Sequence, residues 1–380
     1  MANYQYYSSE DDYIDREREV KEFDDSKIGV KGLVDSGITT IPRFFVHPPE
    51  NLNGAIHNPS ANHDHPHQIP IIDLSALINN SDAHPGRRTR IVQQVGDAAR
   101  RFGFFQIVNH GIPISVMDST ISAIKAFHQL PTEEKKKQYD RSRKGGVTYA
   151  TNAHLFQSKE ATWHDTLGVL TSPVSPDWER VPAVCRRELM EWNAEMKKLG
   201  EVLARLFSEG LGLKPERLEE LKCLESRTQV ANCYPHCPQP HLTLGLASHT
   251  DPRLFTILLQ SELGGLQVKM EDGCWIDVKP MHGALVINVA DLLQVISNGI
   301  YKSVEHRVLA NCHKEPRVSI PVFLGPSEFG NSGQIYGPLP ELVSEEKPAL
   351  YRNFTIQEHM KDFFSNELAV LVNKYKLISN

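Results

Sequence analysis

The chain has 380 residues, of which 40% are hydrophobic and 23% are charged, and its formal net charge is −6. This composition is typical of a globular protein that buries a sizeable core. The negative charge and the absence of a Lys/Arg-rich face argue against a nucleic-acid partner. No run reaches the roughly 18 apolar residues that a membrane helix needs, so we expect no membrane partner either.

The cysteines lie scattered along the chain, at Cys185, Cys223, Cys233, Cys237, Cys274 and Cys312. The N-terminus is polar and acidic, which argues against secretion and organelle import. Scattered cysteines in such a chain indicate reduced thiols. We therefore expect a cytoplasmic protein, and we expect it to be a monomer.

Residues 1–68 form a predicted N-terminal extension and linker. A polar helix is expected over 10–23, and the glycine-containing segment 23–37 is expected to dock on the core. Residues 47–68 have the proline, asparagine and histidine content of a loop. The histidines of this linker are His57, His63, His65 and His67. Metal binding by them is the alternative, but their irregular spacing favours a mobile polar loop.

Residues 69–220 form a predicted helical region that contains two short strands. Apolar residues at helical spacing predict the helices, and short apolar runs predict the strands. The expected strands are 69–74 and 104–111, and the expected helices are 88–102, 114–130, 182–209 and 215–222.

Short strand-like segments replace the helical pattern after residue 226. Their predicted ranges are 228–234, 242–249, 254–260, 264–270, 274–278, 283–289, 301–310 and 316–324, with one helix over 291–297. Closely spaced strands of this kind predict an antiparallel sandwich or barrel. We therefore place a β core at 221–330 and a C-terminal segment at 331–380, which ends in a closing helix over about 355–378.

A metal site is predicted where His249 and Asp251 lie two residues apart in an apolar context. Side chains two apart in a strand point to the same face, so one nitrogen and one oxygen donor would project together. His306 is the candidate third ligand, because it shares the apolar face of its strand with Val304 and Val308. Alone, such a histidine is more often a core residue. Two histidines and one carboxylate suit a non-haem Fe(II) site with open positions.

An anion site is predicted on the strand 316–324, where Arg317, Ser319 and Phe323 share one face. A lone arginine on a strand usually faces solvent, which is the alternative here. If this face is internal, the guanidinium needs an anion, and its planar fork suits a carboxylate. The pattern therefore predicts a small carboxylate ligand near the metal.

These residues together resemble the plant Fe(II)/2-oxoglutarate-dependent dioxygenases. The resemblance covers about residues 20–375. It is carried by His249-x-Asp251, by His306, by Arg317-x-Ser319, by Asn232-Cys-Tyr-Pro-His-Cys-Pro-Gln-Pro240, by Phe102-Gly-Phe-Phe-Gln-Ile-Val-Asn-His-Gly111 and by Ile69-Pro-Ile-Ile-Asp-Leu74. The extension with Phe23-Asp-Asp-Ser-Lys-Ile-Gly-Val-Lys-Gly-Leu-Val-Asp-Ser-Gly37 resembles the group called aminocyclopropane-carboxylate oxidase homologues.

The resemblance implies an α+β fold with a mostly β core, a distorted double-stranded β-helix or jelly roll flanked by helices. It implies that His249, Asp251 and His306 hold Fe(II). It further implies that 2-oxoglutarate is bound through Arg317, Ser319, Tyr234 and Asn232. The family has a second tyrosine where this chain has Cys233, a departure that would alter packing near Asn232.

The implied reaction uses O2 to decarboxylate 2-oxoglutarate to succinate and CO2 while a small molecule is hydroxylated. Ascorbate is expected to support it. Related members hydroxylate alkaloids, steroidal alkaloids and benzoxazinoids, and a phenolic substrate is a further option. Demethylation and desaturation are variants within the family. Formation of ethylene by aminocyclopropane-carboxylate oxidation is a weaker expectation, because the enzymes that do so lack the extension.

Four residues are candidate substrate contacts. Phe323 is expected to reach toward the metal, and Val230 shares a strand face with Asn232. Tyr149 and Phe156 lie in a segment, 148–163, that could form a lid. For each aromatic residue, packing in the core is the competing interpretation.

Two other classes of protein remain open at this point. A zinc hydrolase could use the same three ligands with a metal-bound water. It gives no reason for Arg317 and Ser319 to face a ligand. A non-catalytic binding barrel is the other class, and intact metal ligands argue against it.

Overall fold

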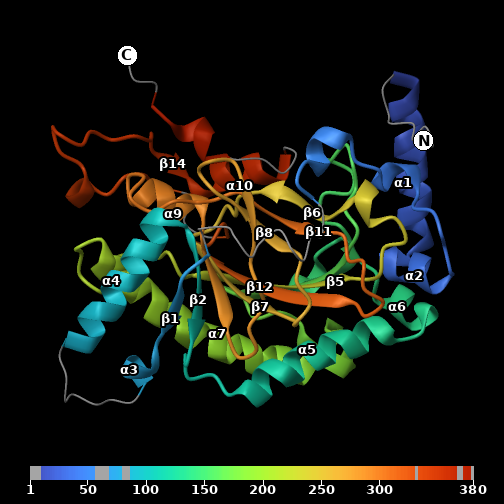
Figure 1. Ribbon diagram of the computed structural model, residues 1–380, viewed down its shortest axis with the longest axis horizontal. Helices are drawn as coiled ribbons and strands as arrows, with labels where there is room; N and C mark the ends of the chain where they lie inside the picture. The colour runs from blue at the N-terminus through green and yellow to red at the C-terminus, as the bar shows by residue number, and fades with distance from the viewer. Residues whose placement is uncertain (1–9, 56–67, 79–85, 330–332, 366–370, 378–380) are drawn as a thin grey trace.

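The structure is a computed structural model that describes residues 10–55, 68–78, 86–329, 333–365 and 371–377 (Figure 1). The linker histidines His57, His63, His65 and His67 lie outside the described residues. Within the described parts of the chain, no helix combines the length and apolarity that crossing a membrane requires.

Most α-helices precede residue 221, and most strands follow it. The helices are α1 (Glu10–Ser26), α2 (Gly29–Asp35), α3 (Ser75–Ile78), α4 (Gly86–Arg101), α5 (Ile114–Gln129), α6 (Thr132–Gln138), α7 (Ala183–Gly210), α8 (Arg217–Glu220), α9 (Asp291–Ile296) and α10 (Ile356–Ser365). The strands are β1 (Ile71–Asp73), β2 (Phe104–Val108), β3 (Val147–Thr151), β4 (Asp165–Ser172), β5 (Ser226–Tyr234), β6 (Leu244–His249), β7 (Phe255–Gln260), β8 (Leu266–Lys269), β9 (Trp275–Asp277), β10 (Leu285–Val289), β11 (His306–Leu309), β12 (Arg317–Gly325), β13 (Ile335–Tyr336) and β14 (Phe354–Thr355).

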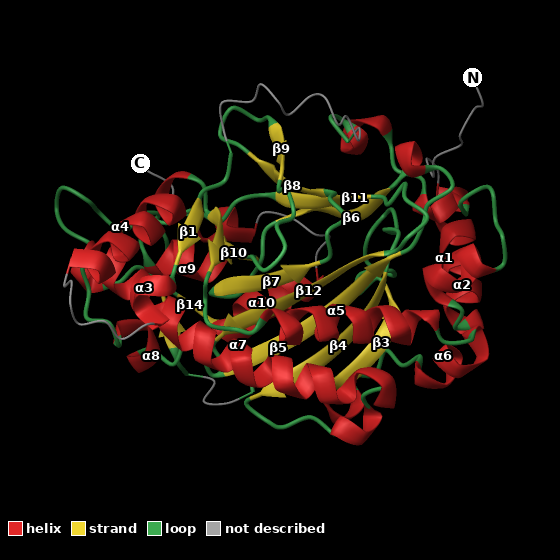
Figure 2. Cartoon of the chain, turned by 60° about the horizontal axis from the view of Figure 1, so that its bottom comes forward, coloured by secondary structure: helices red, strands yellow, loops and turns green. Residues whose placement is uncertain are grey.

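Two facing sheets form the core. The main sheet has eight strands in the order β1-β2-β10-β7-β12-β5-β4-β3, and the small sheet has four in the order β6-β11-β8-β9. Side chains from both sheets pack together between them, among them Phe104 and Tyr234 from the main sheet and Val268 and Val308 from the small one. We call this space the intersheet interior. The expected jelly-roll core flanked by helices is confirmed (Figure 2).

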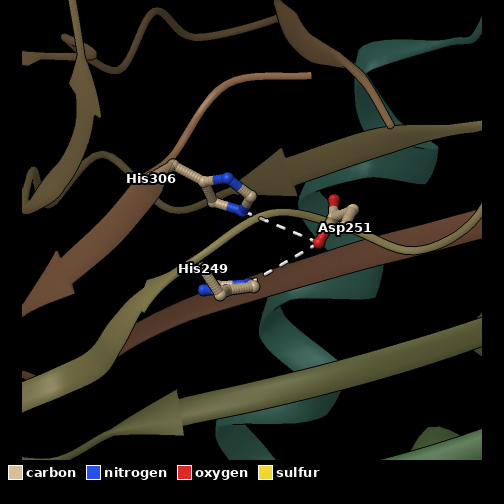
Figure 3. A group of neighbouring side chains, drawn as sticks. All are labelled: His249, Asp251 and His306. Atoms are coloured by element: carbon tan, nitrogen blue, oxygen red, sulfur yellow. Dashed lines mark ion pairs between the residues drawn. The ribbon is translucent and has the colours of Figure 1, made fainter. Parts of the chain in front are cut away.

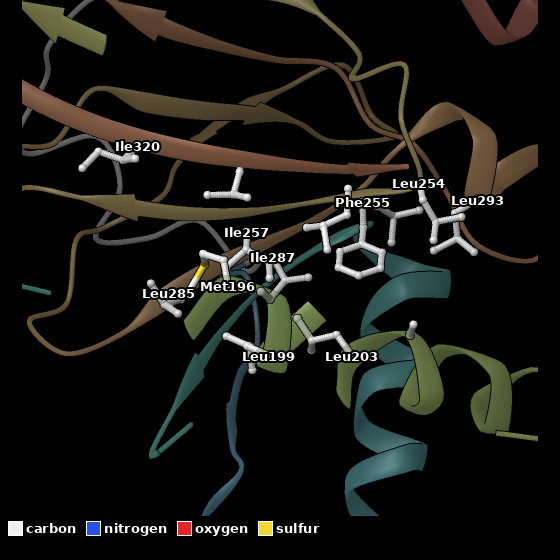
Figure 4. Close-up of a cluster of buried hydrophobic side chains, with 14 of the residues drawn as sticks. Met196, Leu199, Leu203, Leu254, Phe255, Ile257, Leu285, Ile287, Leu293 and Ile320 are labelled. Atoms are coloured by element: carbon white, nitrogen blue, oxygen red, sulfur yellow. The ribbon is translucent and has the colours of Figure 1, made fainter. Parts of the chain in front are cut away.

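The other face of the main sheet is covered by α5 and α7 (Figure 2). Apolar residues of α7 recur at helical spacing, and Met196, Leu199 and Leu203 lie against the sheet residues Ile257 and Ile287 (Figure 4). This stripe fixes the helix on one face of the sheet. These helices do not cover the intersheet face of the main sheet, so that face can hold a functional site.

The sequence-based elements need three corrections. The segment proposed as a lid begins within β3 and ends just before β4, and these two strands pair with each other and extend the main sheet beside β5. The strand expected over 301–310 is confined to β11. Of the closing helix expected over 355–378, α10 covers Ile356–Ser365, residues 366–370 lie outside the described residues, and Leu371–Tyr375 is a 3₁₀ helix instead of an α-helix.

The N-terminal extension is anchored by a buried carboxylate. Asp165 in β4 is fully buried, and it accepts hydrogen bonds of 2.8 Å from the backbone amides of both Val30 and Lys31. These amides lie in the first turn of α2, where they have no partner within the helix. Gly29 just before them has φ +68°, and a Cβ there would lie 2.7 Å from the carboxylate.

Replacement of Gly29 by alanine is therefore expected to destabilise the protein. We expect a loss of about 3 kcal/mol, from left-handed backbone strain and from displaced hydrogen bonds of Asp165. Gly37 is the matched control, because it has φ +80° but no atom within 4 Å of its Cβ position. Gly37→Ala should cost only about 1 kcal/mol. Urea unfolding of the two variants measures the difference, and equal midpoints would contradict the proposed anchor.

Candidate metal and cosubstrate site

Three potential metal ligands meet at one end of the small sheet. His249 ends β6 and His306 begins β11, and the two are paired across the sheet. Asp251 follows β6, and its Oδ1 atom lies 3.6 Å from Nε2 of His249 and 3.7 Å from Nε2 of His306 (Figure 3). One ligand atom from each of the three residues lies within 4.8 Å of the others. This geometry fits a single metal ion.

Backbone carbonyls fix the orientation of both imidazole rings. Nδ1 of His249 lies 2.8 Å from the carbonyl oxygen of Ala247, and Nδ1 of His306 lies 3.2 Å from that of Val304. A proton on each Nδ1 leaves Nε2 with its lone pair toward the shared point. Hydrogen bonding of the second ring nitrogen is the usual way in which proteins orient a metal-binding histidine.

Asp251 is held in a similar way from the main sheet. Its Oδ2 atom accepts hydrogen bonds of 2.6 Å from the hydroxyl of Thr256 and from the amide of Asn288. Oδ1 thus remains directed at the two histidines. Burial alone would raise the pKa of Asp251, but His306, His249 and Thr256 lower this pKa to about 2. Burial and the neighbouring His249 lower the pKa of His306 to about 4, so a charged carboxylate faces a neutral ring near pH 7.

The hydrogen bonds to Asp251 lead to a prediction for metal affinity. Asn288→Leu should weaken binding of Mn(II) or Fe(II) by about 10–100-fold, as is usual when a group that orients a ligand is lost. Asn193→Leu is the control, because Asn193 lies in α7 and accepts a hydrogen bond from Arg227 instead. Anaerobic metal titration measures both variants. Unchanged affinity in Asn288→Leu would contradict this role.

The predicted anion site lies on the same interior face. Arg317 is paired with Tyr234, and Ser319 is paired with Asn232, between the neighbouring strands β12 and β5. Residues directly opposite in adjacent strands share a sheet face. Thr256, which holds Asp251, is paired with Phe323 of the same β12 face. The metal cluster and the predicted anion site therefore share the intersheet interior.

The guanidinium of Arg317 is buried with too few partners. Only 1% of the residue is exposed, and its Nη2 donates to Oε1 of Gln260 at 2.9 Å. The Nε and Nη1 atoms find no hydrogen-bond partner among the described residues. The Tyr234 ring lies 4.9 Å from the guanidinium carbon. Burial lowers the pKa of Arg317, and a buried cation with free donors of this kind fits a carboxylate ligand.

The backbone accommodates Tyr234 through Gly245. A Cβ at Gly245 would lie 2.8 Å from the Tyr234 ring and 2.8 Å from the carbonyl oxygen of Leu309. Asn232 accepts a hydrogen bond from the hydroxyl of Thr166 at 2.8 Å. Cys233 points to the opposite face, where it is paired with Asp165. The departure from the family pattern therefore lies in the helix-covered core.

The proposed substrate residues divide into two pairs. Phe323 and Val230 are half-buried on the interior face. Tyr149 lies on the other face, packed against Phe127 and Tyr139, because the alternation along β3 directs it toward the helices. Phe156 is 49% exposed, so neither it nor Tyr149 is retained as a substrate residue.

The space beside Gly325 of β12 is filled by another side chain. A Cβ at Gly325 would lie 2.8 Å from Cδ of Arg253, which fills that space. Arg253 is held there by hydrogen bonds to the Pro326 carbonyl and to Glu328, each 2.9 Å long.

Several site residues were missed by the sequence analysis. Asn288 interrupts the apolar strand β10 with a single polar side chain, which was a usable signal, and Gln260 is the last residue of β7. His154, Phe363 and Phe364 come together from a loop and from α10. No local sequence pattern predicts that contact, because the partners are more than 200 residues apart in the chain.

A jelly roll with two histidines and one carboxylate beside a buried arginine defines a metal-dependent oxygenase. Comparisons with known proteins agree with this class. Residues 225–326 match the 2OG-Fe(II) oxygenase superfamily model, and residues 69–188 match the model for the non-haem dioxygenase in morphine synthesis N-terminal region.

The chain belongs to the 2OG-Fe(II) oxygenase superfamily, and it is similar to plant members of it. It is 45% identical to 1-aminocyclopropane-1-carboxylate oxidase homolog 1 of Arabidopsis thaliana, over 93% of each chain. It is 44% identical to deacetoxyvindoline 4-hydroxylase of Catharanthus roseus, over 93% of this chain and 86% of that protein. The crystal structure of JOX2 in complex with 2OG, Fe and JA has a TM-score of 0.77 and 31% identity, over 92% of this chain and 97% of that one. The protein is thus a dioxygenase that uses Fe(II), 2-oxoglutarate and O2.

Proposed function

We propose that this enzyme hydroxylates a small specialised plant metabolite of the alkaloid, steroidal alkaloid, benzoxazinoid or phenolic type. His249, Asp251 and His306 would hold Fe(II). Arg317 and Ser319, with Tyr234 beside them, would bind the far carboxylate of 2-oxoglutarate. The observation that carries this proposal is that a metal-ligand cluster and an under-partnered buried guanidinium lie in one interior.

Different residues of the chain have different roles in the reaction. Fe(II), with 2-oxoglutarate and O2, supplies the oxidising chemistry, and 2-oxoglutarate is released as succinate and CO2. Arg317 offers two unused donor atoms to a carboxylate, which fixes the position of the cosubstrate. Thr256 and Asn288 keep the carboxylate of Asp251 directed at the histidines. The two packed sheets exclude water, which limits side reactions of the oxidant.

The substrate class is supported by the relatives and by the side chains near the metal. One relative is named as an alkaloid hydroxylase, at 44% identity. Phe323 lies opposite Thr256 on the interior face, where it offers an aromatic surface to a substrate. Oxidative demethylation or desaturation by the same site is the second candidate. A zinc hydrolase is less well supported, because it leaves the buried donors of Arg317 without a function. We further propose that the enzyme is a cytoplasmic monomer and that ascorbate supports turnover.

The proposal is tested by incubating the protein with Fe(II), 2-oxoglutarate and ascorbate and a panel of plant metabolites. A gain of one oxygen atom in a panel compound, with one succinate formed per product, is the expected result. Loss of a methyl group or of two hydrogens would favour the second candidate. Product formation without O2 would contradict oxygenase chemistry altogether.

A further inference from the structure

We propose that His154 is a specificity-determining residue that hydrogen-bonds a hydroxyl or carbonyl group of a ring-containing substrate. The inference rests on the proposed function, because it concerns the substrate of the same site. It goes further by naming the side chain that would hydrogen-bond a polar group of the substrate. It also assigns the N-terminal extension a role in positioning that side chain.

His154 belongs to the segment between β3 and β4 and is 6% exposed. Its ring is in contact with two aromatic residues of α10. The Phe363 ring meets it edge-on at 5.4 Å, and the Phe364 ring lies nearly parallel to it at 6.4 Å. The loop and the closing helix therefore meet at this histidine. The two phenyl rings are apolar neighbours of His154, and the guanidinium carbon of Arg143 lies 4.6 Å from the centre of the Phe364 ring.

Helix α10 links His154 to the metal cluster. Nε2 of His359, one helical turn before Phe363, lies 2.7 Å from the carbonyl oxygen of Pro252, the residue after Asp251. Burial is the largest cause that lowers the pKa of His154 to about 4, and His249 and Arg143 contribute. The ring is thus neutral near pH 7, with one N–H donor and one acceptor nitrogen. Such a ring can accept from a hydroxyl or donate to a carbonyl.

The Nε2 atom of His154 is buried and has no hydrogen-bond partner among the described residues. Other buried histidines nearby do have partners. His164 lies 2.6 Å from the carbonyl oxygen of Gly245, and His359 lies 2.7 Å from that of Pro252. His128 also lacks partners, but it packs against Phe127 in the helix-covered core. A buried polar atom without a partner is costly, and a partner supplied by the substrate would remove that cost.

Arg16 of the N-terminal extension holds the loop that carries His154. Its guanidinium donates to the carbonyl oxygens of Leu155, Ser158 and Lys159, at 3.2, 2.6 and 2.5 Å. Arg16 is 5% exposed, and Leu155 is fully buried in the cluster that Val20 of α1 also joins. We therefore treat Arg16 as a positioning residue, which acts on the substrate through His154.

The test measures preference for a hydroxyl group in the protein loaded with Fe(II) and 2-oxoglutarate under anaerobic conditions. The probes are matched pairs that differ by one hydroxyl: umbelliferone and coumarin, naphthol and naphthalene, hydroxyindole and indole. In at least one pair, we expect the native protein to bind the hydroxylated member about tenfold more tightly or better. His154→Phe should abolish this preference, and His154→Gln should restore part of it, since its amide again offers a donor and an acceptor.

Arg16→Ala should reduce the hydroxyl preference severalfold, and Arg16→Lys should recover part of it. Arg18→Ala is the matched control, because Arg18 lies on the same helix with 63% of its side chain exposed and pairs only with Asp15 in the described structure. Binding of 2-oxoglutarate should be the same in all these variants.

No hydroxyl preference in any pair, or a preference that survives in His154→Phe, would overturn the role of His154. Equal losses in Arg16→Ala and Arg18→Ala would overturn the positioning role of Arg16. Failure of the proposed function is seen separately, as the absence of succinate release from 2-oxoglutarate in the native protein.

Discussion

Replacement of His249 by alanine is expected to lower succinate formation that depends on Fe(II) and 2-oxoglutarate by more than about 100-fold. Loss of a group that merely orients a ligand already costs about 10–100-fold in metal affinity or activity. His249 itself supplies one of the nitrogens in the cluster and is fixed by the Ala247 carbonyl. The variant should also bind less than one Fe(II) per chain after anaerobic reconstitution, which metal analysis measures.

His282→Ala is the control for this experiment. His282 is exposed and pairs with Asp118 at 3.0 Å, far along the chain from the cluster. This variant should keep full activity and full iron content. A His249→Ala protein that keeps both would show that the three-residue cluster is not the iron site.

The second large effect is expected for Arg317→Met. Without its guanidinium, a carboxylate of 2-oxoglutarate would be buried without a charged partner. Breaking a buried pair in this way costs about 3–5 kcal/mol, which corresponds to 2-oxoglutarate binding that is weaker by a factor of roughly 10² to 4 × 10³. Ligand-free Arg317→Met should be as stable as the native protein or more so, because the guanidinium has only Gln260 as a hydrogen-bond acceptor in the described structure.

Thermal unfolding with and without 2-oxoglutarate separates these two effects. Native protein at 100 times Kd should gain about 2.7 kcal/mol from the ligand, and Arg317→Met should gain almost nothing at that concentration. Arg307→Met is the control, because Arg307 is a buried arginine of β11 that bonds to Gln267 and to the Asn53 carbonyl. It should lower stability and leave the ligand effect intact. A ligand effect that persists in Arg317→Met would refute the carboxylate site.

The metal cluster could be predicted from sequence because side-chain alternation within single strands determines where its residues point. Alternation along a strand places His306 on an apolar face and places Arg317 and Ser319 together on one face. The strand pairing confirms both of these face assignments. Their roles as ligands remain proposals. Asp251 lies just beyond the end of β6 and still points at the histidines, held by Thr256.

The missed features depend on contacts between distant segments. β3 and β4 contain glycine, alanine and several threonines, so their apolar alternation is weak, and pairing with β5 determines their state. Tyr149 was assigned to the substrate because strand β3 was not predicted. Without that strand, the sheet face on which Tyr149 lies could not be inferred. His154 gains its significance only from α10, which lies some 200 residues further along the chain.

The most direct test of the account uses isotopically labelled oxygen. Native protein with Fe(II) and 2-oxoglutarate under ¹⁸O2 should form succinate that carries one ¹⁸O atom, and the hydroxylated product should carry the other. Omission of Fe(II), or the His249→Ala variant, should abolish this labelled succinate. Turnover without O2, or a product whose new oxygen comes from water, would contradict the assignment.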